Sequence, residues 1–165
     1  MAKRGLQLLV RWVPAVGWMC TIFSASTDAM SNQHTSRFFE PFLRSLFPGI
    51  TQERINQLHL LVRKGGHLTE YAILAVLLWW ALGWWQEVRA NRPRRAVLCL
   101  LLAALYAASD EFHQSFVPSR GAAVTDVLID TSGAALGLLG VALLLKIGAL
   151  WSGRPQGEGS LVKAS

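Results

Sequence analysis

Charged side chains are missing from four long stretches of this sequence. These are residues 6–25, which hold only Arg11, and residues 71–86, 96–109 and 131–145, which hold none. With its flanks, each stretch reaches about 20 residues, the length that an α-helix needs to cross a hydrocarbon layer about 30 Å thick. The lack of charge therefore excludes a soluble domain. It predicts an all-α, polytopic membrane bundle with four transmembrane helices.

Cysteine is scarce, and no nucleic-acid-binding pattern is present. Cys20 and Cys99 fall near opposite ends of their apolar runs, so their depths differ by more than the bridging limit of about 7 Å, and no disulfide is expected. The net charge of +6 does not indicate a nucleic-acid partner, because the basic residues form no stripe interleaved with aromatics on a soluble element. We divide the chain into a transmembrane domain, residues 1–150, and a disordered cytoplasmic tail, residues 151–165.

The basic residues instead predict the topology. They gather before the first apolar run, between the second and third runs, and after the fourth, and short loops rich in Lys and Arg stay in the cytoplasm. We therefore expect a multi-pass membrane protein with both termini cytoplasmic. An alternative, in which the first run is a signal peptide, would leave the other orientations unchanged. The clusters are Lys3, Arg4 and Arg11; Arg89, Arg92, Arg94 and Arg95; and Lys146, Arg154 and Lys163.

The first external loop has apolar residues on one side of a short helix between Phe38 and Phe47. This pattern is typical of a helix that lies in the membrane surface, and Pro41, Pro48 and Gly49 are expected to limit its length. Thr51 is a candidate cap for a second short helix. Gly65 and Gly66 are expected to interrupt the helical structure just before the second span.

Ionisable residues lie beside the apolar runs. Such groups are costly in hydrocarbon, so they usually face a bundle interior or a cavity and indicate a functional site. With a rise of about 1.5 Å per residue, Glu70, Asp110 and Asp130 lie about 22, 21 and 24 Å from the inner boundary. We therefore expect a single polar pocket in the outer part of the membrane, open to the outside.

Residue spacing places several of these groups on shared helix faces. His67 and Glu70 are three residues apart, and Asp126 and Asp130 share a stripe with a Gly-x-x-x-Gly pair, residues 133–137, which permits close approach of another helix. Arg120 has two interpretations that the residues leave open. It forms a salt bridge with a nearby carboxylate, or its guanidinium clamps a phosphate or carboxylate ligand.

Three motifs stand out in the sequence: RKGGHLTEY at 63–71, SDEFHQSFVPSR at 109–120 and DVLIDTSGAALG at 126–137. Together they resemble the motifs of the VanZ-like family of bacterial membrane proteins. The resemblance covers roughly residues 18–145. It departs at Ser119, where the family often has Gly, and at Asp130, where many members have Asn. The family takes its name from a protein associated with teicoplanin resistance. The resemblance therefore implies a bacterial cytoplasmic (inner) membrane protein with a role in the cell envelope and in antibiotic resistance.

Three functional classes follow. The first is an enzyme at the outer leaflet that acts on a membrane lipid or lipid-linked envelope precursor, the second a lipid-binding or transport protein, and the third a structural protein that acts through partners. In the enzyme, general acid–base residues transfer a proton at a bound anion. A divalent metal is a further alternative, with ligands His67, Glu70, Asp110 and His113. The catalytic candidates are His67, Glu70, Asp110, Glu111 and His113, and the substrate-binding candidates are Lys64, Gln114, Arg120, Asp126 and Asp130.

Overall fold

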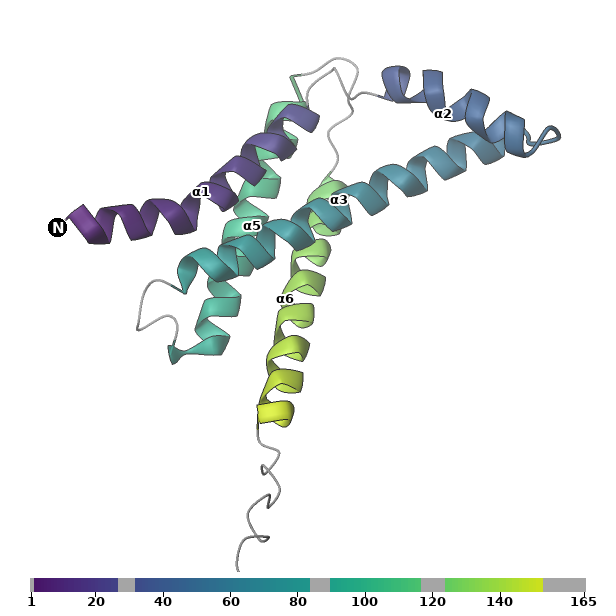
Figure 1. Ribbon diagram of the computed structural model, residues 1–165. Helices are drawn as coiled ribbons and strands as arrows, with labels where there is room; N and C mark the ends of the chain where they lie inside the picture. Colours follow the sequence, from purple (N-terminus) through teal and green to yellow (C-terminus); the bar gives the residue numbers. More distant parts are fainter. Residues whose placement is uncertain (1, 27–31, 84–89, 117–123, 153–165) are drawn as a thin grey trace, which may run out of the picture.

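The computed structural model describes residues 2–26, 32–83, 90–116 and 124–152. These residues form five α-helices and no strand, which confirms the all-α fold (Figure 1). Arg120 and most of the predicted tail lie outside them, so the domain division stays a prediction. The helices are α1 (Ala2–Ala25), α2 (Asn32–Leu46), α3 (Gln52–Leu82), α5 (Arg92–Gln114) and α6 (Val124–Ser152).

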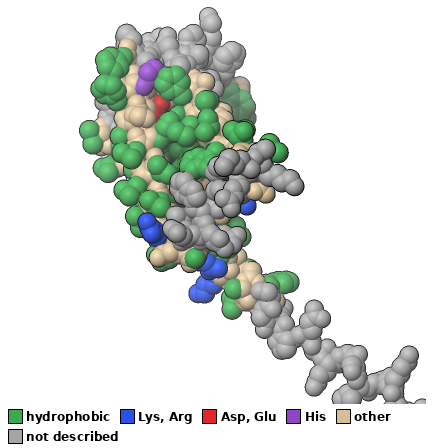
Figure 2. Space-filling view, turned by 90° about the vertical axis from the view of Figure 1, so that its left-hand side faces the viewer, with side chains coloured by type: hydrophobic (Ala, Val, Ile, Leu, Met, Phe, Trp, Pro, Cys, Tyr) green, Lys and Arg blue, Asp and Glu red, His purple; other side chains and the backbone are tan. Residues whose placement is uncertain are grey.

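Four of the helices are long and apolar enough to cross a membrane, as the charge-free runs predict. The segments are Gly5–Ala25, Gln52–Leu82, Arg92–Gln114 and Val124–Trp151. Figure 2 shows the matching surface, on which hydrophobic side chains cover the flank while Lys and Arg side chains gather near its lower end. The chain is therefore a four-span membrane protein, with the short helix α2 between the first two spans.

The second span is longer than predicted, because Gly65 and Gly66 do not break it. Helix α3 runs without interruption over 31 residues, about 46 Å at 1.5 Å per residue. Each helical glycine costs only about 1 kcal/mol, whereas backbone groups left unbonded in hydrocarbon cost several, so a continuous helix is favoured. Pro41 likewise lies inside α2 rather than ending it.

Helix α3 is the centre of the bundle and packs most extensively against α6. A Cβ atom at Gly133 would lie 2.8 Å from Leu68 Cα, and one at Gly137 would lie 2.9 Å from Ala72 Cα. Two turns of α6 therefore rest directly on the α3 backbone. This close approach brings the polar residues one and two turns before Gly133 against the same face of α3.

Candidate functional site

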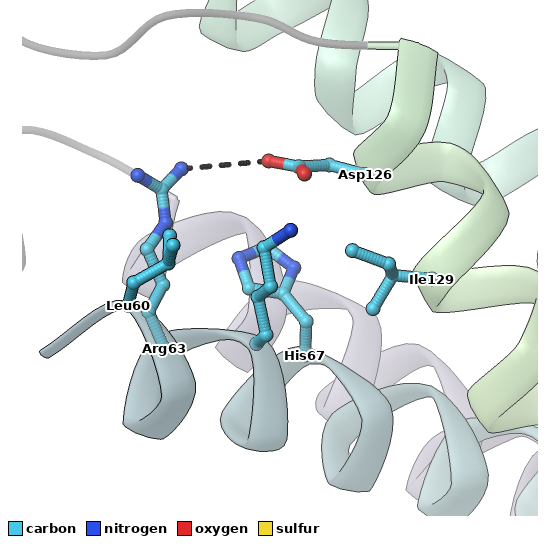
Figure 3. Close-up of a pocket in the computed structure, with 6 residues that line it drawn as sticks. Leu60, Arg63, His67, Asp126 and Ile129 are labelled. Atoms are coloured by element: carbon cyan, nitrogen blue, oxygen red, sulfur yellow. Dashed lines mark ion pairs between the residues drawn. The ribbon is translucent and has the colours of Figure 1, made fainter. Parts of the chain in front are cut away.

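A small cavity lies between α3 and α6, on the N-terminal side of their glycine contact. Its volume is about 40 Å³, room for one or two groups the size of a water molecule. Figure 3 shows Arg63 and His67 reaching from α3 toward Asp126 and Ile129 on α6. The cavity is lined by Leu60, Arg63, Lys64, His67, Asp126 and Ile129.

Arg63 and Asp126 face each other across this cavity without a hydrogen bond. The Arg63 Nη2 atom lies 3.8 Å from Asp126 Oδ2, beyond the normal range for an N–H···O bond. Nη2 is buried and has no hydrogen-bond partner among the described residues. The Arg63 guanidinium therefore keeps donor capacity for another acceptor.

His67 is held by a buried carboxylate. Its Nδ1 atom lies 3.0 Å from Asp130 Oδ1, and the Asp130 side chain is fully buried. Because an ionised carboxylate only accepts hydrogen bonds, the Nδ1 atom of His67 is the donor beside an ionised Asp130. The contact fixes the tautomer and orientation of an imidazole that lines the cavity, which is the arrangement that general base catalysis uses.

A second polar cluster joins the end of α1 to α5. Ser26 Oγ donates to Asp110 Oδ2 over 2.6 Å, and Gln114 Nε2 donates to the same oxygen over 2.9 Å and approaches Ser26 Oγ to 3.2 Å. All three side chains are buried. They do not line the cavity between α3 and α6, so the predicted polar residues make two distinct sets of contacts.

Tyr71 lies between the two clusters. Its side chain is fully buried in α3, and it is within electrostatic range of Glu70, Asp110 and Asp130. Glu70 is partly buried, and its backbone carbonyl accepts a 2.8 Å hydrogen bond from Trp18 Nε1 of α1. The three carboxylates predicted at one depth are thus all within electrostatic range of one buried tyrosine on the central helix.

The remaining predicted residues have other surroundings. Glu111 is buried in α5, and the His113 ring packs against Phe23 of α1 with centroids 4.4 Å apart and the ring planes tilted by 39°. Arg120 lies outside the described residues. Within the described ranges, no group of three or more His, Cys, Asp and Glu side chains is placed to hold a metal ion.

Sequence reasoning did not assign Arg63 and Ser26 to the site. Arg63 has a signal in the sequence, because it precedes His67 by four residues and so shares its helix face. Ser26 has no periodicity signal, because it follows the last residue of α1, where helical spacing no longer specifies direction.

Comparison with known protein families gives a match over most of the chain. The VanZ/LLP1 family profile matches residues 11–145, which include all five described helices in part or in whole. No curated protein and no solved structure matches the chain. The matched region contains both polar clusters and the glycine contact, and the chain is a membrane protein of the VanZ/LLP1 family.

Proposed function

We propose that this protein binds the anionic head group of a membrane lipid or lipid-linked phosphate in the cavity between α3 and α6. The observation that carries the proposal is the cationic wall of that cavity. Arg63 and Lys64 both line it from α3, and Arg63 Nη2 has no hydrogen-bond partner among the described residues. Guanidinium and ammonium groups are the usual ligands of phosphate.

The size of the cavity favours a head group over a whole lipid. A volume of about 40 Å³ admits only a few atoms, so the acyl or prenyl chain would lie along the apolar flank of α3 and α6. Leu60 and Leu128 are exposed apolar residues on these two helices. A phosphate that accepted hydrogen bonds from the Arg63 guanidinium would replace its 3.8 Å contact with the Asp126 carboxylate.

Proton transfer at the bound anion is a second candidate function, and the contact between His67 and Asp130 favours it. An aspartate that orients a histidine leaves Nε2 as the general base or acid for a group held by Arg63 and Lys64. The site would face the outside of the bacterial inner membrane, because the basic clusters predict cytoplasmic termini. A role in the envelope, including glycopeptide resistance, is consistent with family membership.

The test measures binding of a polyprenyl monophosphate and of the matching polyprenol by native mass spectrometry of detergent-solubilised protein. We expect binding of the phosphate and not of the alcohol. The double variant Arg63→Gln/Lys64→Gln is expected to lose affinity at least tenfold, about 1.4 kcal/mol. Arg54→Gln serves as the matched control, since Arg54 is an exposed arginine of the same helix. Equal binding of the phosphate and the alcohol would contradict the proposal, and so would an equal loss of affinity in Arg54→Gln.

Turnover separates the two candidate functions. Incubation of the protein with a radiolabelled polyprenyl phosphate or diphosphate, followed by thin-layer chromatography, reports any change to the head group. His67→Gln is expected to retain lipid binding while abolishing product formation if the site is catalytic. Binding without product in the wild-type protein assigns the site to lipid binding or transport.

A further inference from the structure

Helix α2 and the first part of α3, Gln52–Val62, form a hairpin that extends away from the crossing of α3 with α5 and α6 (Figure 1). Leu43 of α2 and Ile55 of α3 are buried in this hairpin, and the Phe39 ring packs edge-on against the His59 ring with centroids 4.4 Å apart. The contact between the two helices therefore uses part of the apolar side that the sequence predicts for the membrane surface.

One edge of the hairpin is polar. Arg44 of α2 pairs with Glu40 at 3.0 Å and donates to Gln52 Oε1 of α3 over 2.6 Å. Gln52 in turn donates to Asn56 Oδ1 over 3.3 Å. Because the bond between Arg44 and Gln52 joins the two helices, these four side chains lie along one edge, which we call the polar edge.

The opposite edge is apolar and exposed. With 3.6 residues per turn, Phe42 and Leu46 project from the side of α2 that lies away from the polar edge. Leu61 does the same on α3. The side chains of Phe42, Leu46 and Leu61 are 59%, 56% and 64% exposed. These three residues form an apolar edge to which both helices contribute.

The apolar edge continues into an exposed apolar side of the second span. Val62, which adjoins Leu61, is followed along α3 by Ile73, Val76 and Trp80 in steps of eleven, three and four residues, which fall on one side of a helix. All four side chains are exposed, and they belong to a helix long and apolar enough to cross a membrane. The lipid-facing side of the span and the hairpin edge thus form one continuous apolar surface.

The length of α3 agrees with a position of the hairpin at the membrane surface. Its 31 residues extend about 46 Å, whereas the hydrocarbon layer is about 30 Å thick. Spans that are too long tilt, and at about 40°, the upper end of the usual range, α3 would reach about 35 Å across the bilayer. That distance crosses the hydrocarbon and enters one head-group layer, so the hairpin would lie within this layer.

We propose that the hairpin is a membrane-surface arm, whose apolar edge inserts among lipid acyl chains at the head-group boundary while its polar edge faces water. The lipids are those of the bilayer that the four spans cross. An interfacial helix buries its apolar face by about 5–10 Å and turns its polar face to water, and here two helices share that division. The inference extends the predicted surface helix to α3, and it does not depend on ligand binding in the cavity.

The arm would also set how α3 is rotated relative to the membrane. Asn56 of the polar edge is followed by Arg63 and His67 in steps of seven and four residues, so the polar edge and these two cavity residues lie on one side of α3. Anchoring of the apolar edge in acyl chains would turn this side away from them. The cavity would then be held in a fixed orientation at the membrane surface.

Site-directed spin labelling of the full chain in vesicles of phosphatidylethanolamine and phosphatidylglycerol tests the proposal. The two native cysteines are replaced by alanine, and a nitroxide is attached at Leu46→Cys or Leu61→Cys on the apolar edge. Ser45→Cys and Asn56→Cys are the matched controls, since both are exposed polar positions on the same two helices. The measurement compares collision of the nitroxide with O₂, which concentrates among acyl chains, and with a water-soluble nickel complex.

We expect O₂ to collide faster than the nickel complex with labels at Leu46 and Leu61, and slower with labels at Ser45 and Asn56. A second variant tests the anchoring itself. With the label at Leu61, Phe42→Ser/Leu46→Ser is expected to shift the collision ratio toward the nickel complex, and Ser45→Ala is expected to leave the ratio unchanged.

Faster collision with the nickel complex at Leu46 and Leu61 would place the apolar edge in water and overturn the proposal. Slow collision with both reagents would show that protein covers this edge, which would also overturn it. Spectral broadening that disappears on dilution with unlabelled protein would then identify a second copy as the cover. Head-group binding in the cavity is measured separately by native mass spectrometry, so failure of one proposal is distinguishable from failure of the other.

Discussion

His67 on α3 and Asp130 on α6 form a 3.0 Å hydrogen bond one turn before the glycines at which these helices touch. The two contacts have different consequences. The glycines set how closely the helices approach. The hydrogen bond between His67 and Asp130 sets the orientation of the imidazole that lines the cavity. The cavity geometry depends on both contacts, and a substitution at each contact tests its contribution separately.

Removal of Asp130 is expected to destabilise the protein. Asp130→Ala leaves the buried Nδ1–H of His67 without an acceptor, which costs about 1–3 kcal/mol. Asp130→Asn keeps an acceptor oxygen and is expected to cost less. Thermal unfolding in detergent measures both. A melting temperature of Asp130→Ala equal to that of the wild type would show that the hydrogen bond is not made in the membrane protein.

Gly133 and Gly140 are expected to respond to alanine with opposite signs. Alanine normally stabilises a helix by up to about 1 kcal/mol relative to glycine, and nothing lies within 4 Å of a Cβ at Gly140. At Gly133 the methyl group would meet the Leu68 backbone, and such overpacking costs about 1–3 kcal/mol. We expect a lower melting temperature for Gly133→Ala and an equal or higher one for Gly140→Ala. Stabilisation by Gly133→Ala would contradict the packing described for α3 and α6.

Much of this fold could be predicted from the sequence, because hydrocarbon imposes strong constraints. The four charge-free runs predict the spans, since charged side chains are too costly to lie in the lipid. The spacing of Asp126, Asp130, Gly133 and Gly137 also indicates one face of α6, and that face meets α3 in the structure. Residue periodicity within a single helix therefore indicates which face of that helix is buried.

Contacts between helices were harder to predict. Residue counting gives the depth of Glu70, Asp110 and Asp130, but depth does not specify the rotation of each helix about its axis. The structure consequently places His67 with Asp130, and Asp110 with Ser26 and Gln114. The length of α3 was also missed, because local glycine propensity at residues 65–66 is weaker than the need to pair backbone groups in a membrane.

Arg95 is expected to stabilise the C-terminal end of α3. Its guanidinium stacks on Trp79, 4.1 Å from the ring centroid, and its Nε donates over 2.8 Å to the Trp79 carbonyl. Arg95→Gln removes the stacking and the charge-assisted bond, so we expect a loss of about 1–3 kcal/mol in the free energy of unfolding. Arg94→Gln is the matched control, since Arg94 is the exposed neighbouring residue. Equal melting temperatures for the two variants would contradict this role.

Cysteine labelling in intact cells tests the predicted topology. The native cysteines are replaced by alanine, and single cysteines are introduced at two exposed positions, Ser45 on α2 and Asn91 at the start of α5. Because the arginine-rich connection before α5 is expected in the cytoplasm, a membrane-impermeant maleimide should label Ser45→Cys in intact cells and Asn91→Cys only after lysis. The reverse pattern would place the cationic cavity on the cytoplasmic side. A lipid that enters this cavity would then come from the inner leaflet, which would exclude an envelope precursor displayed on the outer surface.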